Sequence, residues 1–194
     1  MFPLKYILKD PTVEFAVLES ARGGILRSGL GFSRCDIAII TNIQEDHLGL
    51  SDIHTLEDLA RVKSTVVKSV KKDGWAILNA EDEQCLKIAN ELSCNIAYFS
   101  MDENNPKVKK FSKEGKIVAV YENGFITIKK GEWKIRVERA THVPLTMGGK
   151  AKFMIANVLA ATLASYLQGF KTDDISLSLQ TFIPSAAQTP GRMN

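Results

Sequence analysis

The hydrophobic residues of this chain fall into short runs separated by stretches of helical periodicity. Four runs are apolar and rich in aliphatic residues, which is typical of strands buried on both faces of a parallel sheet: 13–19 (VEFAVLE), 36–42 (DIAIITN), 75–79 (WAILN) and 96–100 (IAYFS). Helical patterns run from Thr55 to about Lys72 and from about Asp82 to Leu92. This alternation predicts an α/β fold with a doubly wound, mostly parallel sheet and flanking helices.

Turn and cap residues support these boundaries. Residues 20–35 join the first two runs, contain four glycines and are long enough for a crossover between parallel strands. Thr55 is expected to cap the next helix with Asp58 as its partner, and Asp73-Gly74 is expected to end that helix.

The pattern changes after residue 100. Residues 101–112 are polar and rich in lysine, and we expect a solvated loop there. Residues 116–139 alternate apolar and polar positions around Asn123-Gly124 and Lys130-Gly131, which predicts a small antiparallel β meander.

Two helices are expected to close the chain, from Ala151 to Gln168 and from Asp173 to Thr181. The length favours a single unit, residues 1–194. It would comprise an α/β sheet core in 1–100, the loop and meander in 101–147, and a helical return to the core in 148–194.

Polar residues follow the predicted strands where each strand ends. Glu19 ends the first strand, the sequence NIQEDH from Asn42 to His47 follows the second, and Asn79 ends the third. Open α/β sheets bind ligands outside the carboxyl ends of their strands, so we expect these residues to gather at one edge.

Lys63 is placed by helix geometry instead. At about 100° per residue, it falls in an apolar stripe with Leu59, Val62, Val66 and Val70, whereas Ser64 falls on the polar side. Burial there disfavours the ammonium form, and a neutral amine can react with carbon dioxide to give a carbamate, an anionic oxygen ligand for magnesium. The alternative is that Lys63 extends to water or pairs with a carboxylate.

Composition excludes several classes of function. A net charge of +3 is too small to indicate a nucleic-acid partner, and no apolar run is long enough to span a membrane. Three cysteines without metal-ligand spacing are expected to be free thiols, as in a cytoplasmic protein. His54 and His142 are expected to be surface or packed side chains, and Asn79-Ala-Glu-Asp can be a turn and helix cap.

Several motifs together resemble the Mur ligase family, especially the branch that makes cyanophycin, a branched polymer of aspartate and arginine. The matching segments are VLESARGGILR (17–27), CDIAIITNIQEDHLG (35–49), EDLARVK (57–63), LNAED (78–82), ANVLAA (156–161) and PGRMN (190–194). DHL, NAxD and PGR are shared across Mur-type ligases, whereas ESARGGILR points to the cyanophycin branch. The resemblance covers nearly the whole chain.

The resemblance implies a ligase that uses ATP and Mg²⁺ to activate a carboxylate as an acyl phosphate, which an amine then attacks. It implies that Glu19, His47 and a carbamylated Lys63 bind the metal, with Lys63 and His47 also serving catalysis. Asn157 would lie near the adenine, and Arg192 near the ribose and phosphates. The implied partners are arginine, an aspartate-based polypeptide acceptor and the rest of the ligase polypeptide. The resemblance implies a cytoplasmic enzyme. It leaves the oligomeric state open, and a homo-oligomer is one of the alternatives.

One family element is missing from the sequence. No G-x-x-x-x-G-K-[ST] loop, which would hold the nucleotide phosphates, occurs in this chain. We therefore expect a fragment of the central ATPase domain that is inactive alone, with the phosphate loop before Met1 and a further domain after Asn194. The alternatives are another Mur-type ligase acting on a muramyl peptide or folate, a non-catalytic remnant serving as a binding module, and a metal hydrolase.

Overall fold

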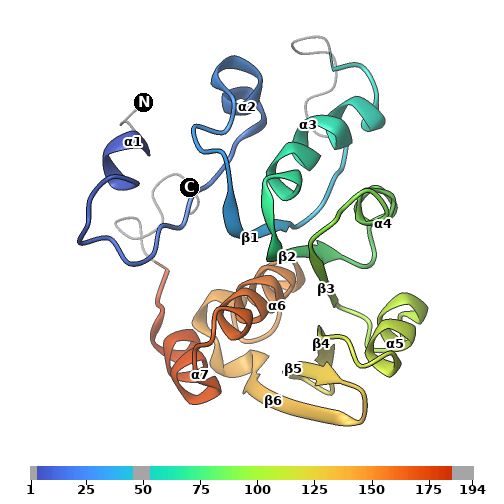
Figure 1. Cartoon of the computed structure of the whole chain (residues 1–194). Helices are drawn as coiled ribbons and strands as arrows, with labels where there is room; N and C mark the ends of the chain where they lie inside the picture. Colours follow the sequence, from blue (N-terminus) through green and yellow to red (C-terminus); the bar gives the residue numbers. More distant parts are fainter. Residues whose placement is uncertain (1–3, 46–52, 185–194) are drawn as a thin grey trace.

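The fold centres on one mixed sheet of six strands in a computed structural model, which describes residues 4–45 and 53–184 (Figure 1). The strands follow one another across the sheet in sequence order: β1 (Cys35–Ile40), β2 (Val70–Asn79), β3 (Asn95–Ser100), β4 (Val118–Glu122), β5 (Phe125–Lys130) and β6 (Trp133–Arg139). The pairings from β1 to β4 are parallel, and those from β4 to β6 are antiparallel. The predicted α/β class is confirmed.

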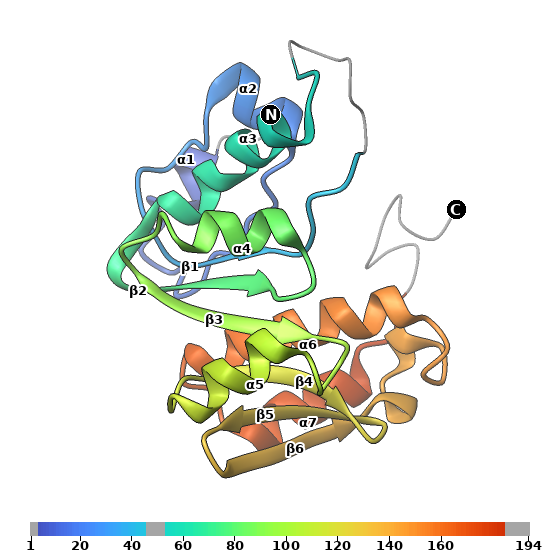
Figure 2. The same cartoon turned by 90° about the vertical axis from the view of Figure 1, so that its right-hand side faces the viewer.

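Helices cover both faces of this sheet (Figures 1 and 2). On one face lie α3 (Leu56–Lys68), α4 (Glu83–Ala89) and α5 (Pro106–Lys113); on the other lie α6 (Lys152–Leu167) and α7 (Thr172–Thr181). The short helices are α1 (Leu4–Ile7), α2 (Arg22–Ser28), and the 3₁₀ turns η1 (Ala140–His142) and η2 (Pro144–Thr146).

The alternation of side chains along each strand divides the core between these layers. In β2, Ala76 and Leu78 pack against α3–α5, whereas Ile77, between them, packs against α6. Such burial on both faces explains why the central strands read as continuous apolar runs.

The predicted strand at 13–19 does not form. This segment has no ladder pairing, and its Val17 side chain is 99% exposed. A strand must hydrogen-bond to a neighbour, but β1 is the edge strand of the sheet and pairs, among the described residues, only with β2. Apolar composition alone was therefore an insufficient basis for predicting this strand.

The helix caps were predicted better than the helix ends. Thr55 and Asp58 form the expected reciprocal capping box at the start of α3. However, α3 ends at Lys68, and β2 already begins at Val70, so Asp73-Gly74 lies within a strand rather than ending a helix.

The predicted loop at 101–112 is also wrong, because it contains most of α5. Asn105 caps this helix by accepting hydrogen bonds from the amides of Lys107 and Val108, and Pro106 occupies its first turn. Val108 and Phe111 are buried, so the lysines lie on the outer side of an amphipathic helix.

The predicted meander forms as β4–β6 and is continuous with the main sheet through the β3–β4 pairing. Asn123 and Gly124 both have positive φ, at 51° and 83°, as a tight hairpin turn requires. The three cysteines are free thiols, as expected. Within the described residues, no helix is both long enough and apolar enough to cross a membrane.

Replacing Gly74 with alanine is expected to destabilise the fold by about 1–3 kcal/mol, because overpacking forces backbone movement. A Cβ atom at Gly74 would lie 2.3 Å from the carbonyl oxygen of Asp36 and 2.8 Å from Val70 Cγ1. Urea unfolding measures the effect. Gly24→Ala is the control, since its Cβ in α2 would meet nothing within 4 Å; equal stability of the two variants would contradict the prediction.

Candidate active-site edge

The carboxyl ends of β1, β2 and β3 meet at one edge, as parallel pairing requires. Two hydrogen bonds connect the first two ends there. Asn79 Nδ2, at the end of β2, donates to the Thr41 carbonyl oxygen at 3.0 Å. The Ile43 amide donates to Asp82 Oδ2 at 2.5 Å, and Asp82 Oδ1 also caps α4 by accepting from the Cys85 amide at 3.0 Å.

Glu81 extends this network to the end of β3. Its Oε1 accepts hydrogen bonds from Ser100 Oγ at 2.7 Å, from the Asp102 amide at 3.2 Å and from the Met101 amide. The interpretation of Asn79-Ala-Glu-Asp as a turn and cap is therefore confirmed, but it was incomplete. This four-residue sequence joins the ends of three strands.

Lys63 reaches this edge from α3. Its Nζ donates to the carbonyl oxygen of Asn42 at 3.0 Å, so Lys63 contacts the segment that follows β1. The side chain is half-buried rather than fully enclosed. The helix-wheel prediction was wrong about Ser64, which is buried and donates to the Arg61 carbonyl oxygen, so Lys63 lies at the margin of the buried face.

The other predicted site residues have different positions. Glu19 is exposed and lies in the segment without regular secondary structure before α2, a helix that packs against α3. His47 and Arg192 lie outside the described residues. Asn157 is exposed on α6, which covers the opposite face of the sheet from α3.

The oxygen donors at this edge are suited to a hard cation. The described residues supply the Asn42 carbonyl oxygen at this edge and the Glu19 carboxylate in the segment before α2, and a carbamate on Lys63 would add anionic oxygens. Within residues 4–45 and 53–184, no group of three or more His, Cys, Asp or Glu side chains could hold a metal. The donor types fit magnesium, and His47 would be needed to extend the set.

Cys85 lies beneath this edge, and its side chain is fully buried. Burial raises the pKa of its thiol to about 12; the charge of Asp82 acts in the same direction, whereas that of Lys63 opposes it. The Cys85 Sγ atom lies 4.0 Å from the Ile40 carbonyl oxygen. These interactions place Lys63, Asp82 and Cys85 in one electrostatic environment, in which a thiolate is disfavoured.

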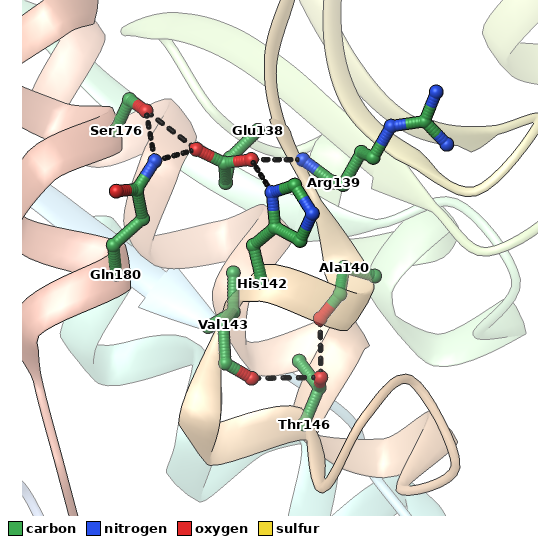
Figure 3. Close-up of polar contacts among 8 residues, drawn as sticks. All are labelled: Glu138, Arg139, Ala140, His142, Val143, Thr146, Ser176 and Gln180. Atoms are coloured by element: carbon green, nitrogen blue, oxygen red, sulfur yellow. Dashed lines mark hydrogen bonds and ion pairs between the residues drawn. The ribbon is translucent and has the colours of Figure 1, made fainter.

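A second polar cluster is centred on Glu138 of β6, the edge strand opposite β1, and Figure 3 shows its polar contacts. Glu138 is buried, and its carboxylate accepts hydrogen bonds from Ser176 Oγ at 2.7 Å, from the Arg139 amide at 2.6 Å and from Gln180 Nε2. His142 Nδ1 lies 3.0 Å from Oε1, the oxygen that also accepts from the Arg139 amide, whereas Ser176 and Gln180 donate to Oε2. Sequence patterns did not indicate this cluster, because Ser176 and Gln180 lie 38 and 42 residues after Glu138 in the chain.

The Glu138 cluster joins β6 to α7. Burial alone would raise the pKa of Glu138, but the hydrogen bonds from Gln180, Ser176 and Arg139 outweigh it, so this pKa lies below its ordinary value. A cavity of about 320 Å³ lies alongside, between β6 and α7, lined in part by Arg136, Asp173, Ser176 and Gln180. Because β6 is the edge strand opposite β1, this cavity is separate from the edge that carries Lys63.

Comparison with known proteins gives a consistent family. The family model of the Mur ligase middle domain matches residues 4–165. The chain is 53% identical to cyanophycin synthetase from Trichormus variabilis over 188 residues, which is 97% of this chain and 21% of that protein. It is also 53% identical to cyanophycin synthetase from Crocosphaera subtropica over 193 residues, 100% of this chain and 22% of that protein.

Solved structures agree on the fold. MurF from Acinetobacter baumannii superposes with a TM-score of 0.54 at 20% identity, covering 82% of this chain and 31% of that one. The chain thus spans about a fifth of the length of the curated relatives that it matches.

Proposed function

Because this chain belongs to the Mur ligase middle-domain family, we propose that it forms part of the central domain of an ATP-dependent amide ligase acting in the cytoplasm. The observation that carries the proposal is the position of Lys63, whose Nζ is held at the carboxyl edge of the sheet by the Asn42 carbonyl oxygen. Ligands of open α/β sheets bind at this edge.

The proposed reaction has two steps. A substrate carboxylate oxygen attacks the γ-phosphorus of ATP, the bond from that phosphorus to the β–γ bridging oxygen breaks, and ADP leaves. An amine nitrogen then attacks the acyl phosphate carbon, the carbon–oxygen bond to phosphate breaks, and the nitrogen loses a proton. One amide, one ADP and one phosphate result.

Lys63 is proposed to act as a carbamate. The lone pair of the neutral amine attacks carbon dioxide, one carbon–oxygen π pair moves to oxygen, and the nitrogen releases a proton to water. Glu19, His47 and this carbamate would hold Mg²⁺, which neutralises phosphate charge during phosphoryl transfer. Asn157 and Arg192 are proposed to contact the adenine and the ribose-phosphate part of ATP.

The proposed substrates are arginine and an aspartate-based polypeptide, with arginine joined to aspartate side chains. Support comes from the two cyanophycin synthetases that share 53% of their aligned residues with this chain. Since the chain spans about a fifth of either relative, the rest of a longer ligase polypeptide is proposed as its partner.

A chimera tests this proposal. The matching 22% of the Crocosphaera subtropica synthetase is replaced by this chain, and arginine incorporation into an aspartate-based primer is measured with ATP and Mg²⁺. We expect ATP-dependent incorporation. A folded chimera that incorporates no arginine but ligates a muramyl peptide or folate would favour another Mur-type ligase, and one with no ligation or nucleotide binding would favour a non-catalytic module.

The isolated 194-residue chain is expected to show no ligation under the same conditions, because its sequence contains no Gly-Lys-Ser/Thr phosphate loop. Release of ADP and formation of product are measured together. Sustained product formation by the isolated chain would contradict this prediction while leaving the ligase proposal intact.

A further inference from the structure

Three consecutive residues after β1 are each held by a side chain from a different element. Asn79 of β2 binds the Thr41 carbonyl oxygen, Lys63 of α3 binds the Asn42 carbonyl oxygen, and Asp82 at the start of α4 binds the Ile43 amide. We call residues 41–43 the clamped loop. Without these contacts, a non-helical, non-strand segment at a sheet edge would be among the more mobile parts of a fold.

The clamped loop connects Asn79 to Lys63, because the two side chains hydrogen-bond to carbonyl oxygens of neighbouring loop residues. Asn79 fixes the carbonyl on one side of Asn42, and Asp82 fixes the amide on the other, so both peptide planes around Asn42 are restrained. The carbonyl that these planes orient is the acceptor for Lys63 Nζ at 3.0 Å. Hence the direction in which Lys63 is held depends on Asn79 and Asp82.

The same hydrogen bond can persist after carbamylation. A carbamate nitrogen keeps one N–H, and its nitrogen, carbon and oxygens lie in one plane. An N–H directed at the Asn42 carbonyl oxygen therefore also fixes the plane of the two carbamate oxygens. We propose that Asn79 and Asp82 are positioning residues that orient the Lys63 amine, and its carbamate, through the clamped loop. The carbamate part rests on the proposed function.

Asn79 offers the sharper test, because Asp82 also caps α4. Asn79→Asp keeps the Oδ1 acceptor for the Glu81 amide but loses the donor to Thr41, and Asn79→Ala removes that donor without adding charge. Asn95→Asp and Asn95→Ala are matched controls, since Asn95 Nδ2 similarly donates to a backbone carbonyl oxygen, that of Asp73, at 3.1 Å. Asn95 begins β3, at the opposite end of the sheet's parallel strands.

The experiment uses the isotope-labelled 194-residue chain in ¹³C-bicarbonate with Mg²⁺. Nuclear magnetic resonance reports hydrogen exchange of the Ile43 amide and the ¹³C carbamate on Lys63, assigned by its loss in Lys63→Arg. In both Asn79 variants we expect Ile43 exchange to accelerate roughly three- to tenfold and the ratio of carbamate to free lysine to fall by a similar factor, as loss of one hydrogen bond predicts. The Asn95 variants should leave both unchanged.

Two results would overturn the positioning role: unchanged Ile43 exchange in the Asn79 variants, or faster exchange with an unchanged Lys63 signal. If the unsubstituted chain shows no carbamate, that result counts against the carbamate in the proposed function alone. The Lys63 ammonium protons then decide, because a persistent hydrogen bond slows their exchange with water. We expect them to be visible in the unsubstituted and Asn95 chains and broadened in the Asn79 variants; equal visibility would overturn the proposal.

Discussion

Replacing Lys63 with arginine in the chimeric synthetase is expected to lower the rate of arginine incorporation by at least about a hundredfold. The reason is electrostatic: removing one preorganised group that stabilises transition-state charge typically costs this much. Arginine keeps the positive charge and can still donate to the Asn42 carbonyl oxygen, but it cannot form a carbamate. Initial rates at saturating ATP measure the effect.

Lys68→Arg is the matched control, because Lys68 lies on the same helix and pairs with Glu91 at 2.7 Å on the surface. It should leave the rate within about twofold, as expected for an exposed ion pair. A small carboxylic acid such as acetate should partly restore Lys63→Ala by supplying the missing oxygens, but should not restore Lys63→Arg, whose longer side chain fills the space. A Lys63→Arg chimera as active as the unsubstituted one would exclude the carbamate role.

The elements that could be predicted from the sequence are those that form because of a few neighbouring residues or because of a repeated hydrophobic pattern. Thr55 and Asp58 form their capping box within one helical turn, and Asn123-Gly124 adopts the positive φ values that its residue types favour. The apolar runs of β2 and β3 matched their burial because helices cover both faces, whereas β1 is only partly buried, with Ile39 36% exposed on this edge strand. Segment 13–19 has the same composition, but strand formation also requires a backbone partner, which composition cannot reveal.

The candidate site was predictable only in part for a related reason. Strand order brings Asn42 and Asn79 to one edge, and helix periodicity brings Lys63 toward them. The use of Asn79, Glu81 and Asp82 as connections between three strand ends depends on side-chain directions that a linear pattern does not encode. The same holds for Glu138, whose partners Ser176 and Gln180 are brought close only by the packing of α7.

Replacing Glu138 with alanine is expected to lower the free energy of unfolding by about 1–3 kcal/mol, because the hydrogen bonds to this buried, charged acceptor are lost. The substitution would leave Ser176 Oγ, Gln180 Nε2 and the Arg139 amide without this carboxylate. Chemical unfolding measures the loss. Glu91→Ala, which removes a 59% exposed carboxylate, should cost less than about 1 kcal/mol, and an equal loss in the two variants would contradict the role of Glu138.

The contribution of Glu138 should also depend on pH in a defined direction. Its folded-state pKa lies below the ordinary value of 4.5, because its hydrogen bonds outweigh the opposing effect of burial. The stabilisation is therefore fully present well above pH 4.5 and is lost as the pH falls through the folded-state pKa.

Glu122, whose pKa is also lowered by Lys129 and Lys134 despite burial, acts in the same direction, so the unsubstituted chain alone cannot isolate Glu138. The difference in unfolding free energy between the unsubstituted chain and Glu138→Gln removes the Glu122 contribution. This difference should be constant near neutral pH and should narrow below about pH 4.5; a difference that widens on acidification would show that Glu138 is stabilised in its protonated form.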